Sequence, residues 1–279
     1  MKALFDKVSR QCSKAVTESY STSFALATKM LATSIRSDIY NIYGFVRFAD
    51  EIVDTFHDYD KATLFERFET ALDQALEDKI SLNPILNAFQ QTYHRYHIPR
   101  ELVDSFMKSM RMDLHKNVYR TEEEYREYIY GSADVVGLMC LKVFVKGDVA
   151  EYDRLKKSAM ALGSAFQKVN FLRDLKADFE GLNRSYFPNT NLMELDEASK
   201  SRIVNEIKAD FEMGYSGIVM LPNDAKFGVY TAYKYYSKLL VKLQNTPPLE
   251  IKSARIRVPD YQKFGVLARS YVKYKLNMV

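Results

Sequence analysis

Apolar residues recur every three to four positions through most of this 279-residue chain, which is the spacing of one face of an α-helix. The pattern predicts helices over residues 5–19, 34–54, 63–78, 84–96 and 99–117, and three closing helices over residues 196–219, 224–243 and 259–278. Between these groups, one helix is expected to open at Thr121, and another runs through Phe166 and ends at the flexible Gly181. We therefore predict an all-α fold.

Local signals mark the ends of several predicted helices. Asn83 and Pro84 form a cap and first-turn pair, and the residues from Thr121 to Glu124 predict a capping box. Gly131 and Gly137 fall inside the helix that Thr121 opens, where a glycine costs about 1 kcal/mol against alanine. We expect close packing or a local break of the helix around these two glycines.

Composition favours one folded domain over the whole of residues 1–279. A hydrophobic content of 47% is ample for a large core, and 10 glycines, 7 prolines and the absence of repeats leave no obvious linker. The net charge of +4 is too mild for nucleic-acid binding, although it is compatible with an anionic membrane surface. Cys12 and Cys140 lack metal-site spacing and are expected to be reduced thiols of a cytoplasmic protein without a signal peptide.

A row of polar side chains interrupts one of the most apolar segments. Asn170, Asp174 and Asp178 recur every four residues, so a helix places them on one face, among apolar neighbours such as Phe171 and Leu175. Acidic groups that face an enclosed space raise one another's pKa unless a cation lies between them. Hard oxygen ligands without nearby His or Cys favour Mg²⁺. The alternative interpretation is a solvated charged face, which this spacing alone does not exclude.

A second acidic row repeats the same spacing. Asp50 and Asp54 lie four residues apart inside the helix predicted over residues 34–54. Two acidic rows on helices far apart in the sequence could face each other across one cavity and hold a diphosphate through bridging Mg²⁺. Arg47 and Arg173 lie beside the rows as donors for direct phosphate contacts. Together, the two rows favour a metal and diphosphate site over a solvated surface.

These rows lie among blocks that resemble the squalene and phytoene synthase family across nearly the whole chain. The blocks are Ser21 to Phe24, Tyr43 with Arg47 and the Asp50 and Asp54 pair, Met110 to Leu114, Tyr128 to Gly137, Gln167 to Asp178, and Asn183 to Pro188. The chain departs from the family pattern at Glu51, where a second consecutive Asp is common, and at Asp134, which replaces a small residue. Neither is the first or last Asp of a metal pair, so the activity is expected to persist.

The resemblance implies a single-domain helical bundle of the isoprenoid-synthase type around a central cavity. Tyr43 and Tyr128 are implied to be catalytic, because an aromatic face at the cavity can stabilise a passing carbocation. Asp113 is carried over as a further residue at the cavity. The implied catalytic acids and metal ligands are Asp50, Asp54, Asp174 and Asp178, with Asn170 as an additional metal ligand. The implied diphosphate-binding residues are Ser21, Ser23, Arg47, Gln167, Asn170, Arg173, Arg184 and Tyr186, and the implied lipid pocket contains Phe24, Val135 and Gly137.

The implied activity is that of a prenyltransferase, the head-to-head condensation of two geranylgeranyl diphosphate molecules to phytoene in carotenoid biosynthesis, through a cyclopropyl (prephytoene) diphosphate. Mg²⁺ is the implied cofactor, Mn²⁺ is an alternative ion, and NADPH is not expected. A squalene or dehydrosqualene synthase acting on C15 farnesyl diphosphate stays open, as does a more remote alternative, a non-catalytic assembly factor of the same fold. A head-to-tail transferase or terpene cyclase would carry Asp-Asp-x-x-Asp or Asn-Asp-x-x-Ser motifs, which differ from the rows found here.

Location and partners follow from the same resemblance. The chain ends without the apolar anchor of about 20 residues that a membrane-tethered relative needs. This favours a protein like the bacterial phytoene synthases, in the cytoplasm or peripheral at the inner face of the membrane. Prenyl diphosphates are the implied substrates, and a downstream carotenoid desaturase is the implied recipient of the product. The segment at residues 255–259, with Lys263, resembles the family's basic C-terminal segment, which could contact a phosphate or form a solvated surface; the solvated surface is the favoured expectation.

Overall fold

The structure of the chain is a computed structural model that describes residues 1–182, 184–188, 190 and 195–276. Within these ranges the chain forms α-helices and one π-helical segment, and its one β-bridge joins Val118 to Ser185. The helices are α1 (Lys2–Tyr20), α2 (Thr22–Lys29), α3 (Thr33–Asp54), α4 (Lys61–Asp78), α5 (Pro84–Arg95), α6 (Arg100–Met112), α7 (Glu122–Ile129), the π-helix η1 (Tyr130–Asp134), α8 (Val135–Phe144), α9 (Val149–Leu182), α10 (Glu197–Ile218), α11 (Asn223–Asn245), α12 (Pro248–Ser253) and α13 (Asp260–Lys275).

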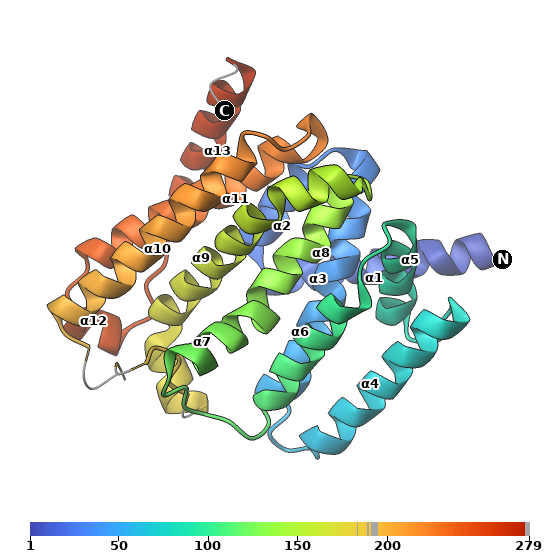
Figure 1. Cartoon of the computed structure of the whole chain (residues 1–279), viewed down its shortest axis with the longest axis horizontal. Helices are drawn as coiled ribbons and strands as arrows, with labels where there is room; N and C mark the ends of the chain where they lie inside the picture. The colour runs from blue at the N-terminus through green and yellow to red at the C-terminus, as the bar shows by residue number, and fades with distance from the viewer. Residues whose placement is uncertain (183, 189, 191–194, 277–279) are drawn as a thin grey trace.

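Two long helices, α3 and α9, form the centre of the bundle. At 34 residues, α9 extends for about 50 Å, and it packs against α8 on one side and α10 on the other (Figure 1). Helix α3 packs against α1, α5 and α8. The C-terminal ends of α3 and α9 both point toward the lower part of Figure 1, so the acidic rows that they carry lie at the same end of the bundle. No helix in the described ranges combines the length and the hydropathy that crossing a membrane requires.

The bundle has two hydrophobic cores of different character. The first is built on α3 to α6 and α8, and the stacked rings of Phe45 and Phe89 at its centre lie 4.0 Å apart. The second lies between α7, α9, α10 and α11 and contains several tyrosines, among them Tyr119, Tyr128 and Tyr186. The second core therefore places phenolic hydroxyls inside the half of the molecule that holds the acidic row of α9.

Several helix ends differ from those that the sequence predicts. The helix predicted over residues 99–117 ends at Met112, because Asn117 and Tyr119 instead form backbone hydrogen bonds with Ser185. Helix α9 continues through Gly181 to Leu182, and the short helix α12 has no counterpart in the prediction. Two expectations fall partly outside the described residues, namely the motif position Asn183 and the last residues of the helix predicted to reach residue 278.

The start of the α7 helix is close to the predicted one. Thr121 accepts a hydrogen bond from the backbone N–H of Glu124, as a capping box requires. The Glu124 carboxylate, however, accepts from the backbone N–H of Arg120 instead of that of Thr121. The Thr121 cap is therefore confirmed, while the reciprocal half of the box is displaced by one residue.

The predicted local break and the predicted close packing both occur. Residues Tyr130–Asp134 widen into η1 directly after α7, around Gly131. Past this turn, Gly137 lies so close to α9 that an added Cβ would be 3.0 Å from the carbonyl oxygen of Ala159. On the other helix, a Cβ at Gly163 would lie 2.9 Å from the carbonyl oxygen of Ala133. These glycines let η1 and α8 approach α9 backbone to backbone.

Candidate active site

A cavity of about 320 Å³ lies between α2, α3, α8, α9, α10 and α11. Its lining changes along its length. One end is apolar and is formed where the helices turn, by Leu31, Phe144, Leu155 and Leu221. At the other end the lining includes Tyr43 and Gln167, which lie about two helical turns before Asp50 and Asp174, and Asn170, which lies about one turn before Asp174. The cavity therefore leads from hydrocarbon-like walls to a polar end.

The predicted lipid pocket matches this cavity at two of its three positions. Phe24 and Gly137 line the cavity, and the ring of Phe24 stacks on that of Tyr43 with centroids 4.8 Å apart. Val135 instead lies in the first hydrophobic core, and its neighbour Val136 lines the cavity. Successive helical residues point in different directions, so only one of these two valines can face the cavity.

The acidic row of α3 lies beside arginines. Arg47 donates to Asp50 at 2.6 Å and to Glu51, and its guanidinium lies 4.4 Å from the ring centroid of Tyr20. Asp54 accepts a hydrogen bond from Arg184 at 2.6 Å. The side chains of Asp50 and Asp54 are 32% and 28% exposed. Both carboxylates thus reach solvent while each is paired with a cation.

The acidic row of α9 has a similar arrangement. Asp174 accepts from Arg173, and its Oδ1 lies 2.6 Å from Nε of Arg255, which belongs to the segment between α12 and α13. Asn170, one turn earlier, lines the cavity, and its side-chain oxygen is buried without a hydrogen-bond partner. A buried carbonyl oxygen without a donor is costly, and a cation would satisfy it.

The two rows are close enough to influence each other. Burial is the largest effect that raises the pKa of Asp50 above its ordinary value, and repulsion from the carboxylate of Asp54 is the second. Burial raises the pKa of Asp178 to about 7, and the carboxylates of Asp174 and Asp54 add to this increase. Since Asp54 belongs to α3 and Asp178 to α9, repulsion acts between the rows as well as within each of them.

These residues suit a hard divalent cation. Within the described ranges, no three carboxylate, imidazole or thiol groups come together as a metal site on their own. Mg²⁺ needs no such cluster, because it commonly takes one or two protein carboxylates and completes its shell with water and substrate phosphate. The unpartnered oxygen of Asn170 and the mutual repulsion of Asp54 and Asp178 both fit a cation between the rows.

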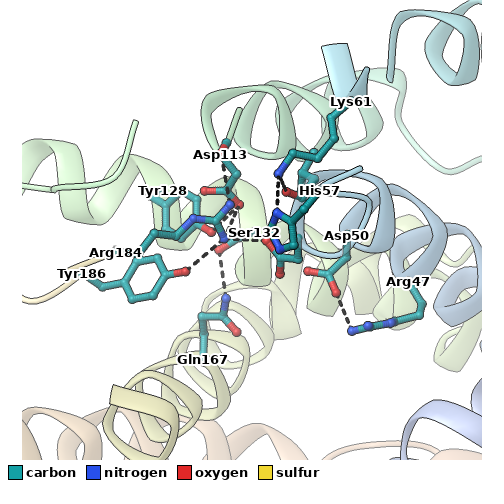
Figure 2. Close-up of polar contacts among 12 residues, drawn as sticks. Arg47, Asp50, His57, Lys61, Asp113, Tyr128, Ser132, Gln167, Arg184 and Tyr186 are labelled. Atoms are coloured by element: carbon teal, nitrogen blue, oxygen red, sulfur yellow. Dashed lines mark hydrogen bonds and ion pairs between the residues drawn. The ribbon is translucent and has the colours of Figure 1, made fainter. Parts of the chain in front are cut away.

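The remaining predicted residues near the cavity differ in their contacts. Ser21 caps α2 by accepting from the backbone N–H of Phe24 at 3.2 Å, and Ser23 follows within the first turn of that helix. Gln167 lines the cavity and donates to Ser132 of η1 at 3.4 Å (Figure 2). The capping role of Ser21 leaves its hydroxyl at the start of α2, at the same end of the cavity as Tyr43.

Three predicted site residues are buried behind the acidic rows. Tyr128 lies in the second core, where its hydroxyl donates to Asp113 at 2.8 Å, so its ring does not line the cavity as expected. The ring of Tyr186 stacks on Phe171 with centroids 3.9 Å apart. Arg184, whose side chain is 3% exposed, reaches between Tyr186 and Asp113 (Figure 2).

The contacts of two residues of the site, Arg255 and Asp113, were not predicted from the sequence. The basic segment at residues 255–259, with Lys263, was expected to be a solvated surface; the side chain of Arg255 is indeed 47% exposed, but it also contacts Asp174. Further along this segment, Lys263 donates to Thr22 at the start of α2. Asp113, expected at the cavity, is buried and bonded to Tyr128. Both residues had a signal in the sequence. Arg255 lies in a run of basic residues, and Asp113 is an acid in an apolar helix, but neither signal identifies the residue that it contacts.

Comparisons with known proteins identify the family of the chain. The family model for squalene/phytoene synthase matches residues 17–262. Phytoene synthase 3 from Zea mays is 26% identical over 98% of this chain, which spans 66% of the length of that relative. Phytoene synthase from Arthrospira platensis is also 26% identical, over 94% of this chain and 92% of its own length. The all-α fold is shared with a crystal structure of a dehydrosqualene synthase, with a TM-score of 0.83 over 97% of this chain and 98% of that one, at 20% identity.

The family match covers most of the chain and includes both acidic rows. The fold agrees with it, since the chain and the dehydrosqualene synthase share nearly their whole length. The chain belongs to the squalene/phytoene synthase family.

Proposed function

We propose that this chain condenses two geranylgeranyl diphosphate molecules head to head to phytoene, through a cyclopropyl (prephytoene) diphosphate. The observation that carries the proposal is a cavity that is apolar at one end and leads at the other to two facing acidic rows. This arrangement suits an amphiphilic substrate with a long hydrocarbon chain and a highly charged diphosphate. The relatives from maize and Arthrospira, both phytoene synthases, favour the C20 substrate.

The acidic rows are the proposed site of ionisation. Asp50, Asp54, Asn170, Asp174 and Asp178 would hold Mg²⁺, or Mn²⁺ in its place, which neutralises a diphosphate and makes it a better leaving group. Arg47 and Arg173 now bond to carboxylates of the rows, and they can donate to phosphate oxygens once those carboxylates have another cation. Ser21, Ser23 and Gln167 lie at the same end of the cavity as further donors.

The cavity walls provide for the reactive carbocation. The stacked rings of Phe24 and Tyr43 face this space, and an aromatic face stabilises a cation by about 0.5 to 2 kcal/mol. The apolar residues toward the other end exclude water, which would otherwise add to the cation. Phe24 and Tyr43 are therefore the aromatic residues that we assign to this role.

The bond changes balance without an external oxidant or reductant. The allylic C–O bond of one substrate breaks, its diphosphate leaves, and the allylic double bond of the second substrate attacks the resulting cation. Loss of a proton closes the cyclopropane ring. The second C–O bond then breaks, the ring rearranges to the 1-1′ linked chain, and loss of another proton gives the hydrocarbon. NADPH is consequently not required for phytoene.

The test is the identity of the lipid product. Purified protein with Mg²⁺ is given C20 or C15 prenyl diphosphate in separate tubes, each with and without NADPH, and the extracted lipid is analysed by mass spectrometry. We expect a C40 hydrocarbon from the C20 tube, unaffected by NADPH. A C30 hydrocarbon as the main product would move the assignment to a squalene or dehydrosqualene synthase, and the NADPH arms would separate those two. No product in any tube would contradict an enzymatic role.

A further inference from the structure

We propose that Asp113 is a positioning residue that holds Arg184 against the acid Asp54, and thereby prepares Asp54 to bind the metal. The inference rests on the proposed function, because Asp54 is taken as a metal ligand. Asp113 is the C-cap residue of α6, and its side chain is 2% exposed. A carboxylate so deeply buried is costly unless its partners compensate for the lost water.

Four contacts surround Asp113. The hydroxyls of Tyr128 and Tyr119 donate to its two carboxylate oxygens, at 2.8 and 3.4 Å. Nη2 of Arg184 donates to the backbone carbonyl of Asp113 at 3.1 Å, and Nη1 lies 3.7 Å from its Oδ2. Figure 2 shows Arg184 extended between Tyr186 and Asp113. Asp113 therefore holds the guanidinium through both its main chain and its side chain.

The same guanidinium reaches the acidic row. Nη1 of Arg184 donates to Oδ1 of Asp54 at 2.6 Å, so one arginine links a fully buried acid to an acid that is 28% exposed. The guanidinium is planar and rigid, and fixing one edge on Asp113 fixes the direction of the other edge. With a side chain that is 3% exposed, Arg184 is placed to orient Asp54 rather than to enter the cavity.

Charge balance gives Asp113 a second effect on Asp54. With Asp113 ionised, the positive charge of Arg184 is shared between two carboxylates. Without the negative charge of Asp113, Arg184 would bind Asp54 more strongly and would compete with a metal for the Asp54 carboxylate. Groups that orient metal ligands from behind are commonly worth about 10- to 100-fold in metal affinity. We expect an effect of this size at Asp113.

The backbone around this cluster is fixed independently of the Asp113 carboxylate. The N–H of Arg184 donates to the carbonyl of Asp178 at 2.9 Å. The N–H of Ser185 donates to the carbonyl of Asn117 at 2.8 Å, and the N–H of Tyr119 donates to the carbonyl of Ser185 at 3.1 Å. A change confined to the Asp113 carboxylate therefore acts on the Arg184 side chain while these main-chain bonds remain.

Asp38 provides a matched control. It is also buried, and it accepts from the hydroxyl of Tyr96 at 2.9 Å, from Thr92 at 2.9 Å and from Arg95 at 3.2 Å. Its partners lie on α5 or at the C-terminus of that helix, and Asp38 lies near the start of α3, four turns before Asp54. Neutralising Asp38 removes the same kind of buried charge without touching the acidic rows.

The experiment is a double-mutant cycle on ligand affinity in the full chain. The dissociation constant of inorganic pyrophosphate in saturating Mg²⁺ is measured by calorimetry for wild type, Asp113→Asn, Arg184→Gln, the double variant and Asp38→Asn. Direct Mn²⁺ binding, followed by electron paramagnetic resonance, provides a second readout without pyrophosphate. Thermal unfolding is recorded for every variant, so that affinity and stability are separated.

We expect Asp113→Asn to weaken pyrophosphate and Mn²⁺ binding by about 10-fold or more, and Asp38→Asn to leave both within about twofold. In the Arg184→Gln background, Asp113→Asn should have little additional effect, because the two residues act in series. An equal loss in both backgrounds, or no loss in either, would overturn the proposal. If wild type binds no pyrophosphate with Mg²⁺, the proposed function itself fails.

A second variant covers the case in which Asp113→Asn does not fold. Arg184→Lys keeps the positive charge but cannot reach Asp54 and the carbonyl of Asp113 at once with a planar fork. The same 10-fold weakening is expected for Arg184→Lys. Wild-type affinity in Arg184→Lys would show that the bridge between Asp113 and Asp54 is not needed, and would overturn the inference.

Discussion

The two ends of the cavity are stabilised in opposite ways. At the apolar end, Leu31, Leu155 and Leu221 are buried in the first core, and their burial favours both folding and the binding of a hydrocarbon chain. At the polar end, the carboxylates of Asp50 and Asp178 have raised pKa values because they are partly withdrawn from water and lie beside other acids. The apolar end thus serves stability and binding together, while the polar end is costly without its ligand.

The polar end reduces this cost with arginines. Arg47, Arg173 and Arg184 each bond to an acid of the rows, and Arg255 adds a second cation at Asp174. These cations already lie at the acidic rows before any diphosphate arrives, and they can turn to phosphate oxygens once a metal neutralises the carboxylates. We therefore expect substitutions at the polar end to affect activity and pH dependence, and substitutions at the apolar end to affect the choice of substrate.

The largest effect is expected at the acidic rows. Asp50→Ala or Asp174→Ala should lower turnover by about 10³-fold or more, because each removes a ligand of the cation that neutralises the leaving group. Product formation is measured by mass spectrometry, and circular dichroism checks that the helices persist. Asp58→Ala, at an exposed loop position past the end of α3, is the matched control. Turnover equal to that of the control would remove the two-row site.

A bulkier side chain at the apolar end should alter substrate choice. Val229 lines the cavity from α11, so Val229→Phe fills space needed by the far end of a long prenyl chain. We expect kcat/KM for the C20 substrate to fall by about 10-fold or more, with a smaller loss for the C15 substrate. Val241→Phe, at an exposed position of the same helix, is the control. Equal losses for both substrates would show that the prenyl chain does not reach Val229.

The metal-free protein should become less stable as the pH rises. The folded pKa of Asp178 is about 7, above its ordinary value of 3.8, so the folded state binds this proton more tightly than the unfolded state does. The contribution of Asp178 to the free energy of unfolding therefore declines as the pH rises from about 4 to 7. Asp178→Asn, which cannot ionise, should raise the free energy of unfolding at pH 8 by about 1 to 2 kcal/mol, since water at the open end weakens the full effect.

Denaturant unfolding of wild type and Asp178→Asn in chelator, between pH 5 and pH 8, measures this difference. The two free energies should converge toward acidic pH and separate toward alkaline pH. If the free energies of unfolding of the two proteins ran parallel across this pH range, ionisation of Asp178 would not destabilise the folded state. The same Asp178→Asn protein should be inactive, which would separate stability from function at one residue.

The smallest effect is expected at Arg255. Its side chain is 47% exposed and shares Asp174 with Arg173, so Arg255→Ala should change the free energy of unfolding by less than about 0.5 kcal/mol. We expect a roughly threefold rise in KM for the prenyl diphosphate, because one cation at the diphosphate end is lost. Arg257→Ala, at an exposed position two residues later, is the control, and identical steady-state kinetics for the two variants would exclude a role for Arg255.

Much of the fold could be predicted from the sequence because helical periodicity is a local property. The apolar spacing located the long helices, and Asn83 and Thr121 indeed cap the helices that follow them. Helix ends were less accurate where tertiary contacts decide them. The early end of α6 depends on a backbone pairing with Ser185, more than 60 residues further along the chain, which no local pattern indicates.

The site was predictable to the extent that it follows the helical repeat. The spacing of Asp50, Asp54, Asp174 and Asp178 placed each row on one helix face, and their mutual proximity is visible in the raised pKa of Asp178. What lies behind the rows was not predictable in this way. The bridge from Asp113 through Arg184 to Asp54 joins α6, the segment after α9, and α3, and spacing cannot show which buried charges from separate segments meet.

A crystal structure with Mn²⁺ and an unreactive thio analogue of geranylgeranyl diphosphate would show directly whether the two acidic rows hold the metal. Anomalous scattering locates the metal independently of the ligand. The account predicts Mn²⁺ between the α3 and α9 rows, with the diphosphate beside Arg47 and Arg173 and the prenyl chain running toward Leu221. Metal and diphosphate bound elsewhere, with the acidic rows still paired to their arginines, would contradict it.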